Sequence, residues 1–190
     1  MNVSLDLRIE HDDGEQGGGT WMRIGEELHR EFNRRARELT LMIQGHTIYQ
    51  TMENFWPSAR QDASLPDYMR EYGEIWTAAP KVLVSRTRTQ APHNTRAVGS
   101  SGDTLQEIAA LRAASPGLIG VGGATVATQL LDAGLLDELL LFVHPVVLGK
   151  GRPLFDGDRA PVTTELIEQR AFERGVVMLH YAVGDAALAT

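Results

Sequence analysis

The chain has 190 residues, 43% hydrophobic and 23% charged, which is typical of a globular protein. It contains no cysteine, which excludes disulfides, thiolate metal sites, a cysteine nucleophile and a deaminase zinc site of the His/Cys/Cys type. The net charge of −7 repels nucleic acids and anionic membranes, so cations or backbone amides must gather locally around any phosphate-bearing ligand. Because neither a membrane span nor the apolar core of a signal peptide is found, we expect a cytoplasmic protein without nucleic-acid or membrane partners.

The first forty residues combine a short strand, a polar segment and a helix. Residues 1–5 are typical of the end of a strand, and the glycine-rich stretch 10–20 predicts a mobile loop. From residue 24 to 39 the apolar positions follow the period of a helix, whose other face alternates arginine with glutamate. Mixed signs favour a solvated face over a nucleic-acid-binding one. The loop contains four acidic or imidazole side chains without the spacing of a calcium loop, so we expect no metal site: His11, Asp12, Asp13 and Glu15.

The next segments predict strands that alternate with helices. A short buried strand covers residues 40–44, and a helix runs from about Thr47 towards Phe55 until Pro57 stops it. A weaker helical pattern covers residues 65–79, and KVLVS at 81–85 is a strand.

A further helix begins after Asp103, which is a suitable N-cap with Gln106 at the capping-box position. The pattern predicts that Leu105, Ile108, Ala109 and Leu111 form its buried side.

The last third of the chain contains a strand at 118–121, a helix at 124–133 and a nearly all-apolar strand at 138–144. That strand is typical of one covered on both faces. Segments 163–170 and 174–183 predict an antiparallel ribbon. We therefore predict a single α/β domain over residues 1–190, with a flexible tail at 184–190. Its mostly parallel central sheet has helices on both faces, and ligands bind at the carboxyl ends of such strands.

Three strand–helix junctions are candidates for a ligand site at that edge. The strongest is Gly122-Gly123, where a strand stops and a helix begins at once, so that backbone and helix amides can approach a pyrophosphate. A tight turn without a ligand is an equally good interpretation of this motif alone. The other junctions are Gly45-His46-Thr47 and Ser85-Arg86. Neither a Rossmann fingerprint nor a P-loop fits the chain.

Five stretches in the right order carry a family resemblance: NVSLD (2–6), GHTIYQTMENFWP (45–57), KVLVSRT (81–87), GVGGATVATQLLDAGLLDEL (120–139) and HPVVLGKGRPLF (144–155). With them the chain resembles the dihydrofolate-reductase-like proteins, and most closely the reductase domain of riboflavin biosynthesis, the RibD C-terminal domain. The resemblance implies a three-layer fold, a homodimer and hydride transfer from NADPH to a small pyrimidine or pterin-type substrate. In the riboflavin-pathway reaction a ribosylamino sugar opens to an imine, which accepts the hydride.

The resemblance also implies roles for individual residues. Gly122, Gly123, Ala124 and Thr125 would hold the pyrophosphate, with Gly45, His46 and Thr47 on its other side. Ser85 and Arg86 would lie near the adenosine 2′-phosphate. Asp6 would face the substrate, where it would donate or organise the proton, or else only cap a loop. The glycine-rich segment after it would act as a lid.

Two positions depart from the family pattern, which usually has arginine at His46 and glycine at Leu7. They leave open a degenerate, non-catalytic protein that binds nucleotides or dimerises. Another alternative is dihydrofolate reductase, which needs a carboxylate on the helix near residues 25–31: Glu26, Glu27 or Glu31.

Overall fold

The computed structural model of the chain describes residues 1–10, 19–100 and 102–184. Most of the loop predicted at 10–20, including the four acidic and imidazole side chains, and residues 185–190 of the predicted tail lie outside the described residues. The last two residues of that loop, Gly19 and Thr20, instead belong to a short 3-10 helix, η1 (Gly19–Trp21).

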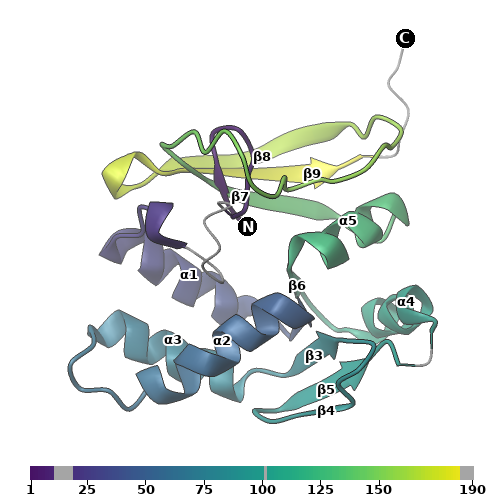
Figure 1. Cartoon of the computed structure of the whole chain (residues 1–190), viewed down its shortest axis with the longest axis horizontal. Helices are drawn as coiled ribbons and strands as arrows, with labels where there is room; N and C mark the ends of the chain where they lie inside the picture. The colour runs from purple at the N-terminus through teal and green to yellow at the C-terminus, as the bar shows by residue number, and fades with distance from the viewer. Residues whose placement is uncertain (11–18, 101, 185–190) are drawn as a thin grey trace. The chain divides into compact units, whose positions relative to one another are not determined.

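The chain divides into two compact units, Glu26–Val126 and Met1–Gly25 with Ala127–Thr190. The single domain predicted over residues 1–190 stays a prediction. Strands and helices alternate as predicted, but the strands lie in two sheets rather than in one (Figure 1).

The unit Glu26–Val126 contains a five-stranded sheet in the order β4-β5-β3-β2-β6. Its strands are β2 (Leu41–Gly45), β3 (Lys81–Val84), β4 (Gln90–Ala91), β5 (Thr95–Val98) and β6 (Ile119–Gly122). All neighbours are parallel except the β4–β5 hairpin, which the sequence analysis missed. The register pairs Ala91 with Thr95, so the hairpin turns through residues 92–94, where His93 and Asn94 have positive φ.

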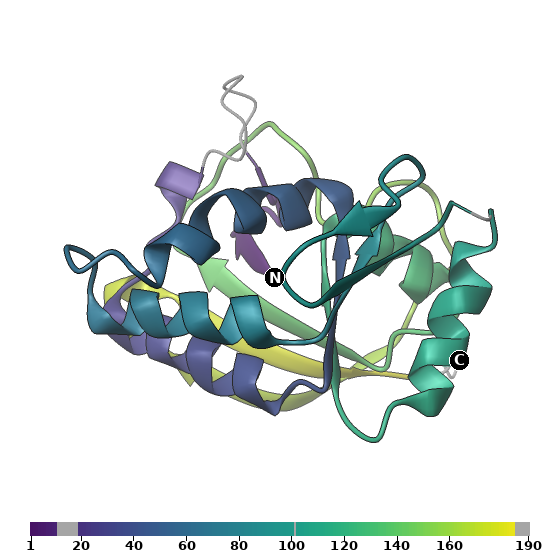
Figure 2. The same cartoon turned by 90° about the horizontal axis from the view of Figure 1, so that it is seen from below.

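Three helices, α1 (Glu26–Glu38), α2 (His46–Ala59) and α3 (Asp67–Ala78), lie on one face of this sheet (Figure 2). Tyr49 and Trp76, both fully buried, pack there against Leu83 of β3. The helix α4 (Thr104–Ala114) lies on the opposite face. The predicted arrangement of helices on both faces of a mainly parallel sheet therefore holds for this unit.

The prediction that Pro57 stops the second helix was wrong, because α2 continues to Ala59. Pro57 removes only one backbone hydrogen bond, within the last turn, and the amide of Arg60 still donates to the carbonyl of Trp56 at 3.3 Å. The ring contact between Trp56 and Tyr72 of α3, at 4.5 Å, also holds the last turn in place.

In α4 the predicted cap is confirmed, since the Asp103 carboxylate accepts a hydrogen bond from the amide of Gln106. The predicted buried side is only partly correct: Ile108 is buried, but Leu105 is 39% exposed. Alanine and leucine occur all around this helix, so the sequence pattern does not single out one face.

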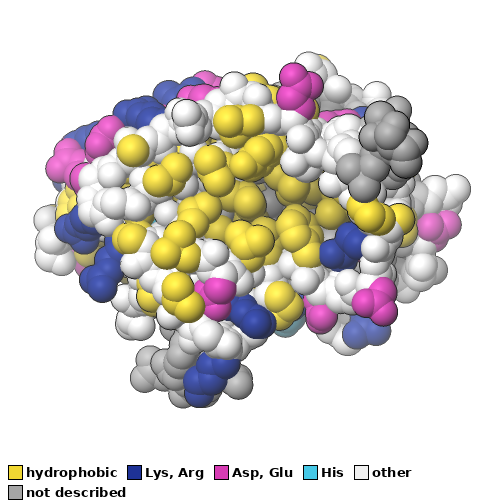
Figure 3. Space-filling view, turned by 90° about the horizontal axis from the view of Figure 1, so that it is seen from above, with side chains coloured by type: hydrophobic (Ala, Val, Ile, Leu, Met, Phe, Trp, Pro, Cys, Tyr) yellow, Lys and Arg dark blue, Asp and Glu magenta, His cyan; other side chains and the backbone are white. Residues whose placement is uncertain are grey.

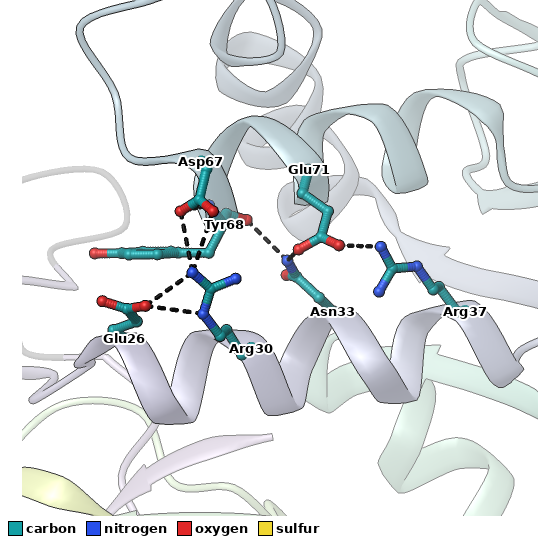
Figure 4. Close-up of polar contacts among 7 residues, drawn as sticks. All are labelled: Glu26, Arg30, Asn33, Arg37, Asp67, Tyr68 and Glu71. Atoms are coloured by element: carbon teal, nitrogen blue, oxygen red, sulfur yellow. Dashed lines mark hydrogen bonds and ion pairs between the residues drawn. The ribbon is translucent and has the colours of Figure 1, made fainter.

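The arginines of α1 lie in ion pairs, and Figure 4 shows those of Arg30 and Arg37. Arg30 contacts both Glu26 and Asp67, and Arg37 contacts Glu71 of α3. Arg34 and Arg35 both bind the buried carboxylate of Glu31. Arg30 and Arg37 thus link α1 to α3. The face was expected to be solvated, but its Glu31 is buried because two arginines pair with it.

The other unit contains a four-stranded sheet in the order β1-β7-β9-β8. Its strands are β1 (Asn2–Ser4), β7 (Glu138–His144), β8 (Thr164–Ala171) and β9 (Val177–Val183). The ribbon predicted near the C-terminus is confirmed as the antiparallel pair β8–β9. The chain passes between the two units within α5 (Ala124–Asp132).

Candidate functional site

Four parallel strands of the five-stranded sheet end at one edge, and their register aligns the ends. Gly45 at the end of β2 pairs with Val84 of β3, and Val84 pairs with Val98 of β5. On the other side of β2, Gln44 pairs with Gly122. The three predicted junctions therefore meet at one sheet edge, where the carboxyl ends of parallel strands bind ligands.

The glycines of two junctions lie against each other. Gly123 has φ of +99°, which glycine adopts without strain. A Cβ atom at Gly123 would lie 3.5 Å from the amide nitrogen of Gly45 and 3.3 Å from Cγ2 of Ile48. A Cβ atom at Gly45 would lie 3.2 Å from Cγ2 of Val126. Side chains at these two positions would therefore crowd the junction.

Two helices begin beside these glycines, α2 after Gly45 and α5 after Gly123. No side chain caps the N-terminus of α2, and both His46 and Thr47 in its first turn are exposed. Ala124 is buried, whereas Thr125 is exposed. The first amides of a helix lack partners within the helix and carry partial positive charge, so this junction is suited to an anionic group.

The third junction combines a buried hydroxyl with an exposed guanidinium. Ser85 is 6% exposed, its amide donates to the carbonyl of Val98, and its Oγ accepts from the amides of Thr87 and Arg88. Arg86 is exposed and makes no ion pair with the residues that the structure describes. Ser85 therefore shapes the turn, and Arg86 remains available to a ligand.

Sequence reasoning missed the residues that anchor this turn. Arg88 forms two hydrogen bonds of 2.7 Å with the carboxylate of Glu53 on α2 and lies over the ring of Tyr49. The bidentate pair lowers the pKa of Glu53 and raises that of Arg88. No local pattern connects residues 35 positions apart, so the pair is visible only in three dimensions.

Gly99, at the end of β5, is a further member of this edge that was not predicted. Its φ is +97°, and a Cβ atom there would lie 3.3 Å from the carbonyl oxygen of Ser85. The signal was present in the sequence, because a strand followed by glycine occurs here just as it does at Gly45 and Gly122.

Asp6 lies in the other unit. Its carboxylate accepts hydrogen bonds from Ser4 Oγ at 2.7 Å and from the amides of Leu148 and Gly149 at 3.0 and 2.8 Å. These hydrogen bonds, with that of Ser4 the largest cause, lower the pKa of Asp6 to about 2. At neutral pH the group is therefore a carboxylate that holds the loop after β7.

Leu7 follows Asp6 with a φ of +54°, in the left-handed region that favours glycine. We predict that Leu7→Gly raises the free energy of unfolding by about 0.5–1 kcal/mol, because relief of backbone strain exceeds the added chain entropy. Leu7 is 42% exposed, so little burial is lost. Urea denaturation measures the change, with Leu5→Gly as control, since Leu5 is 59% exposed and has no positive φ. If Leu7→Gly and Leu5→Gly destabilise the protein equally, the backbone at Leu7 is not strained.

A family model matches most of the chain. The model of the RibD C-terminal domain matches residues 1–178. The chain therefore belongs to the RibD C-terminal domain family. The uncharacterized protein YyaP of Bacillus subtilis strain 168 is 26% identical over 184 residues, which cover 94% of this chain and 93% of YyaP.

Solved structures of proteins named for riboflavin biosynthesis share the fold, as the resemblance implied. A protein of Shewanella sp. PV-4, assigned by name to riboflavin biosynthesis, superposes with a TM-score of 0.73 at 19% identity, covering 97% of this chain and 96% of its own. The riboflavin biosynthesis reductase Rib7 of Saccharomyces cerevisiae gives a TM-score of 0.56 at 13% identity, with 96% and 87% covered. The dihydrofolate-reductase-like α/β fold is thus confirmed.

None of the described helices of this RibD C-terminal domain is long and apolar enough to cross a membrane.

Proposed function

We propose that this protein is an NADPH-dependent reductase of the riboflavin-biosynthesis type, acting on a ribosylaminopyrimidine or related pyrimidine substrate. The observation that carries the proposal is the contact of Gly45 with Gly123 beside the start of α2, which no side chain caps. Side chains would fill this cradle, and helix amides border it, as a pyrophosphate requires. Membership of the RibD C-terminal domain family supports the same conclusion.

Each junction has its own part in this proposal. The segments 45–47 and 122–125 hold the pyrophosphate between two helix N-termini, and Ser85 orients the turn from which Arg86 reaches the 2′-phosphate. When bound, the nicotinamide supplies a hydride to the substrate. The protein's own residues hold the reacting groups in place and exclude water.

Asp6 acts in this proposal as a carboxylate and not as a proton donor, because its pKa is about 2. Three hydrogen bonds occupy most of the roughly four acceptor positions of a carboxylate. The remaining one suits a hydroxyl or amine of the substrate. The carboxylate thereby orients the substrate and the loop at Leu148–Gly149 together.

A dihydrofolate reductase is less well supported. Two of the three carboxylates considered for folate, Glu26 and Glu31, are held in ion pairs with arginines of their own helix. The cytoplasmic location expected from the composition stays a prediction.

The proposal predicts that Arg86→Ala weakens NADPH binding about 10- to 100-fold, the effect of one charge-assisted hydrogen bond, and changes NADH binding less than about threefold. A fluorescence titration of each dinucleotide measures both constants. Arg96→Ala is the matched control, because Arg96 is an exposed arginine within β5 rather than at the carboxyl edge. Equal weakening of NADPH and NADH would reject the phosphate contact. Failure of the folded wild-type protein to bind either dinucleotide would reject the reductase.

A further inference from the structure

The five-stranded sheet has a hollow at the end opposite to the three junctions. Leu41, Lys81 and Thr95, the first residues of β2, β3 and β5, line this amino-end hollow, whose volume is about 550 Å³. That volume is within the range of pockets that bind small molecules. The same three strands end at the junctions of the proposed cofactor site. Four residues of strand span about 10 Å, so a small ligand fills only one of the two sites.

Much of the lining of the amino-end hollow is apolar. Leu41 of β2 and Leu111 of α4 are only half-buried, so the hollow leaves part of two large apolar side chains in water. The apolar lining residues are Leu41, Pro80, Val82, Ala91, Pro92 and Leu111. Walls of this kind suit the flat, apolar body of a small molecule.

The charges at the amino-end hollow are all of one sign. Lys81, His93 and Arg96 line it, and none of its described lining residues carries a carboxylate. This is a local exception in a protein whose net charge is −7. Hydrophobic side chains also gather on the face that Figure 3 shows, but both cations and carboxylates border them there. The amino-end hollow therefore favours an anionic ligand.

Arg96 provides the most suitable group for such an anion. Its side chain is exposed, and it forms neither an ion pair nor a hydrogen bond with the residues that the structure describes. The planar guanidinium of arginine binds a carboxylate through two parallel hydrogen bonds. A carboxylate in the amino-end hollow thus finds a free partner at Arg96.

Lys81 adds a positive charge that no described carboxylate neutralises. The residue is 2% exposed, and its Nζ donates to the carbonyls of Trp76 and Ala79 and lies over the Trp76 ring. Burial lowers the pKa of Lys81 to about 8. A negative charge in the amino-end hollow would stabilise the ammonium group.

The β4–β5 hairpin, which forms one wall, is held in place without a ligand. The hydroxyl of Tyr49 donates to the carbonyl of Pro92 at 3.0 Å, and Nδ2 of Asn94 donates to the carbonyl of Ala78 at 2.9 Å. These bonds flank His93, which has a φ of +61°. Because the wall is already ordered, binding costs little conformational entropy.

We propose that the amino-end hollow binds a small carboxylate with a flat apolar body. The carboxylate group pairs with Arg96 within reach of the positive field of Lys81, and the body lies against the apolar lining. This ligand is distinct from NADPH, because the two sites lie at opposite ends of the same strands. The inference therefore does not depend on the proposed reductase.

An NMR titration of the full-length protein with 2-naphthoate tests the proposal, and 2-naphthamide is the neutral probe of the same shape. We expect a dissociation constant of about 1 mM for 2-naphthoate, as a ligand of about a dozen heavy atoms permits. The amide should bind at least about tenfold more weakly, because it offers no charge to Arg96. Excess NADPH should leave both constants unchanged.

Arg96→Ala should weaken 2-naphthoate binding at least about tenfold and leave 2-naphthamide binding unchanged. Arg86→Ala is the matched control, because it removes an exposed arginine of the same unit at the opposite end of the sheet. It should bind 2-naphthoate as the wild type does. Arg96→Glu should reverse the preference, so that 2-naphthylmethylammonium binds more tightly than 2-naphthoate. Thermal unfolding shows whether each variant is folded.

Several results would overturn the proposal. One is a wild type that does not bind 2-naphthoate, or that binds 2-naphthamide equally well. Another is equal weakening by Arg86→Ala and Arg96→Ala, and a third is displacement of 2-naphthoate by NADPH. NADPH titration of Arg96→Ala tests the cofactor site separately, so that either proposal can fail while the other stands.

Discussion

Replacing Gly123 with valine is expected to raise the dissociation constant for NADPH at least about 100-fold, which corresponds to about 2.7 kcal/mol. The first carbon of the new side chain would lie 3.5 Å from the amide nitrogen of Gly45, at the start of α2. Its methyl groups would cover the amides that the proposed pyrophosphate needs. A fluorescence titration with NADPH measures the loss.

Backbone strain alone must be separated from loss of the site. Gly134, after the end of α5, also has positive φ, but nothing lies within 4 Å of a Cβ atom built there. Because both glycines have positive φ, Gly123→Val and Gly134→Val should each lower the free energy of unfolding by about 1–3 kcal/mol. Only Gly134→Val should leave the NADPH affinity unchanged. If Gly123→Val binds NADPH as tightly as the wild type, or if both variants lose affinity equally, the pyrophosphate site is not at this junction.

The convergence of the three junctions was predictable because a parallel sheet brings the carboxyl ends of its strands to one edge. Gly45, Ser85 and Gly122 each follow a short apolar strand, so local sequence contained the necessary information. The nearly all-apolar segment 138–144 was likewise recognised as a strand, β7. Such features depend on the period and composition of a few neighbouring residues.

Features that depend on distant residues were not predictable from the sequence. The division of the strands into two sheets is a matter of long-range pairing. The β4–β5 hairpin was missed because β4 has only two residues and the turn at 92–94 contains no glycine, so the common Asn-Gly signal is absent. The anchoring of Arg88 by Glu53 and the capping of the loop after β7 by Asp6 join residues 35 and 143 positions apart.

Acid is expected to destabilise this protein through His144, which is fully buried in the core of the unit that contains β7. Its Nδ1 accepts a hydrogen bond from the amide of Arg23 at 2.9 Å, so the proton lies on Nε2, 3.0 Å from Asn2 Oδ1. A second proton would have to bind Nδ1, whose lone pair already accepts the hydrogen bond from the amide of Arg23. Burial lowers the pKa of His144 from 6.5 to about 4.

The sign of the pH effect follows from the direction of that shift. Between pH 6.5 and 4 the unfolded chain binds a proton at His144 that the folded chain does not, so the free energy of unfolding falls as the pH falls. The loss reaches up to about 3 kcal/mol near pH 4, at 1.36 kcal/mol per unit. Burial also lowers the pKa of His29, which adds to the effect in the same direction.

Urea denaturation at several pH values between about 7 and 4.5 measures this dependence. The His144→Gln variant keeps a donor for Asn2 but has no group that titrates in this range. It should therefore be less stable at neutral pH and lose less stability on acidification than the wild type. His46→Gln removes an exposed histidine and should keep the full wild-type slope. If the slope survives in His144→Gln, another group is responsible for the acid sensitivity, and the neutral, buried imidazole is not what holds Arg23 and Asn2 together.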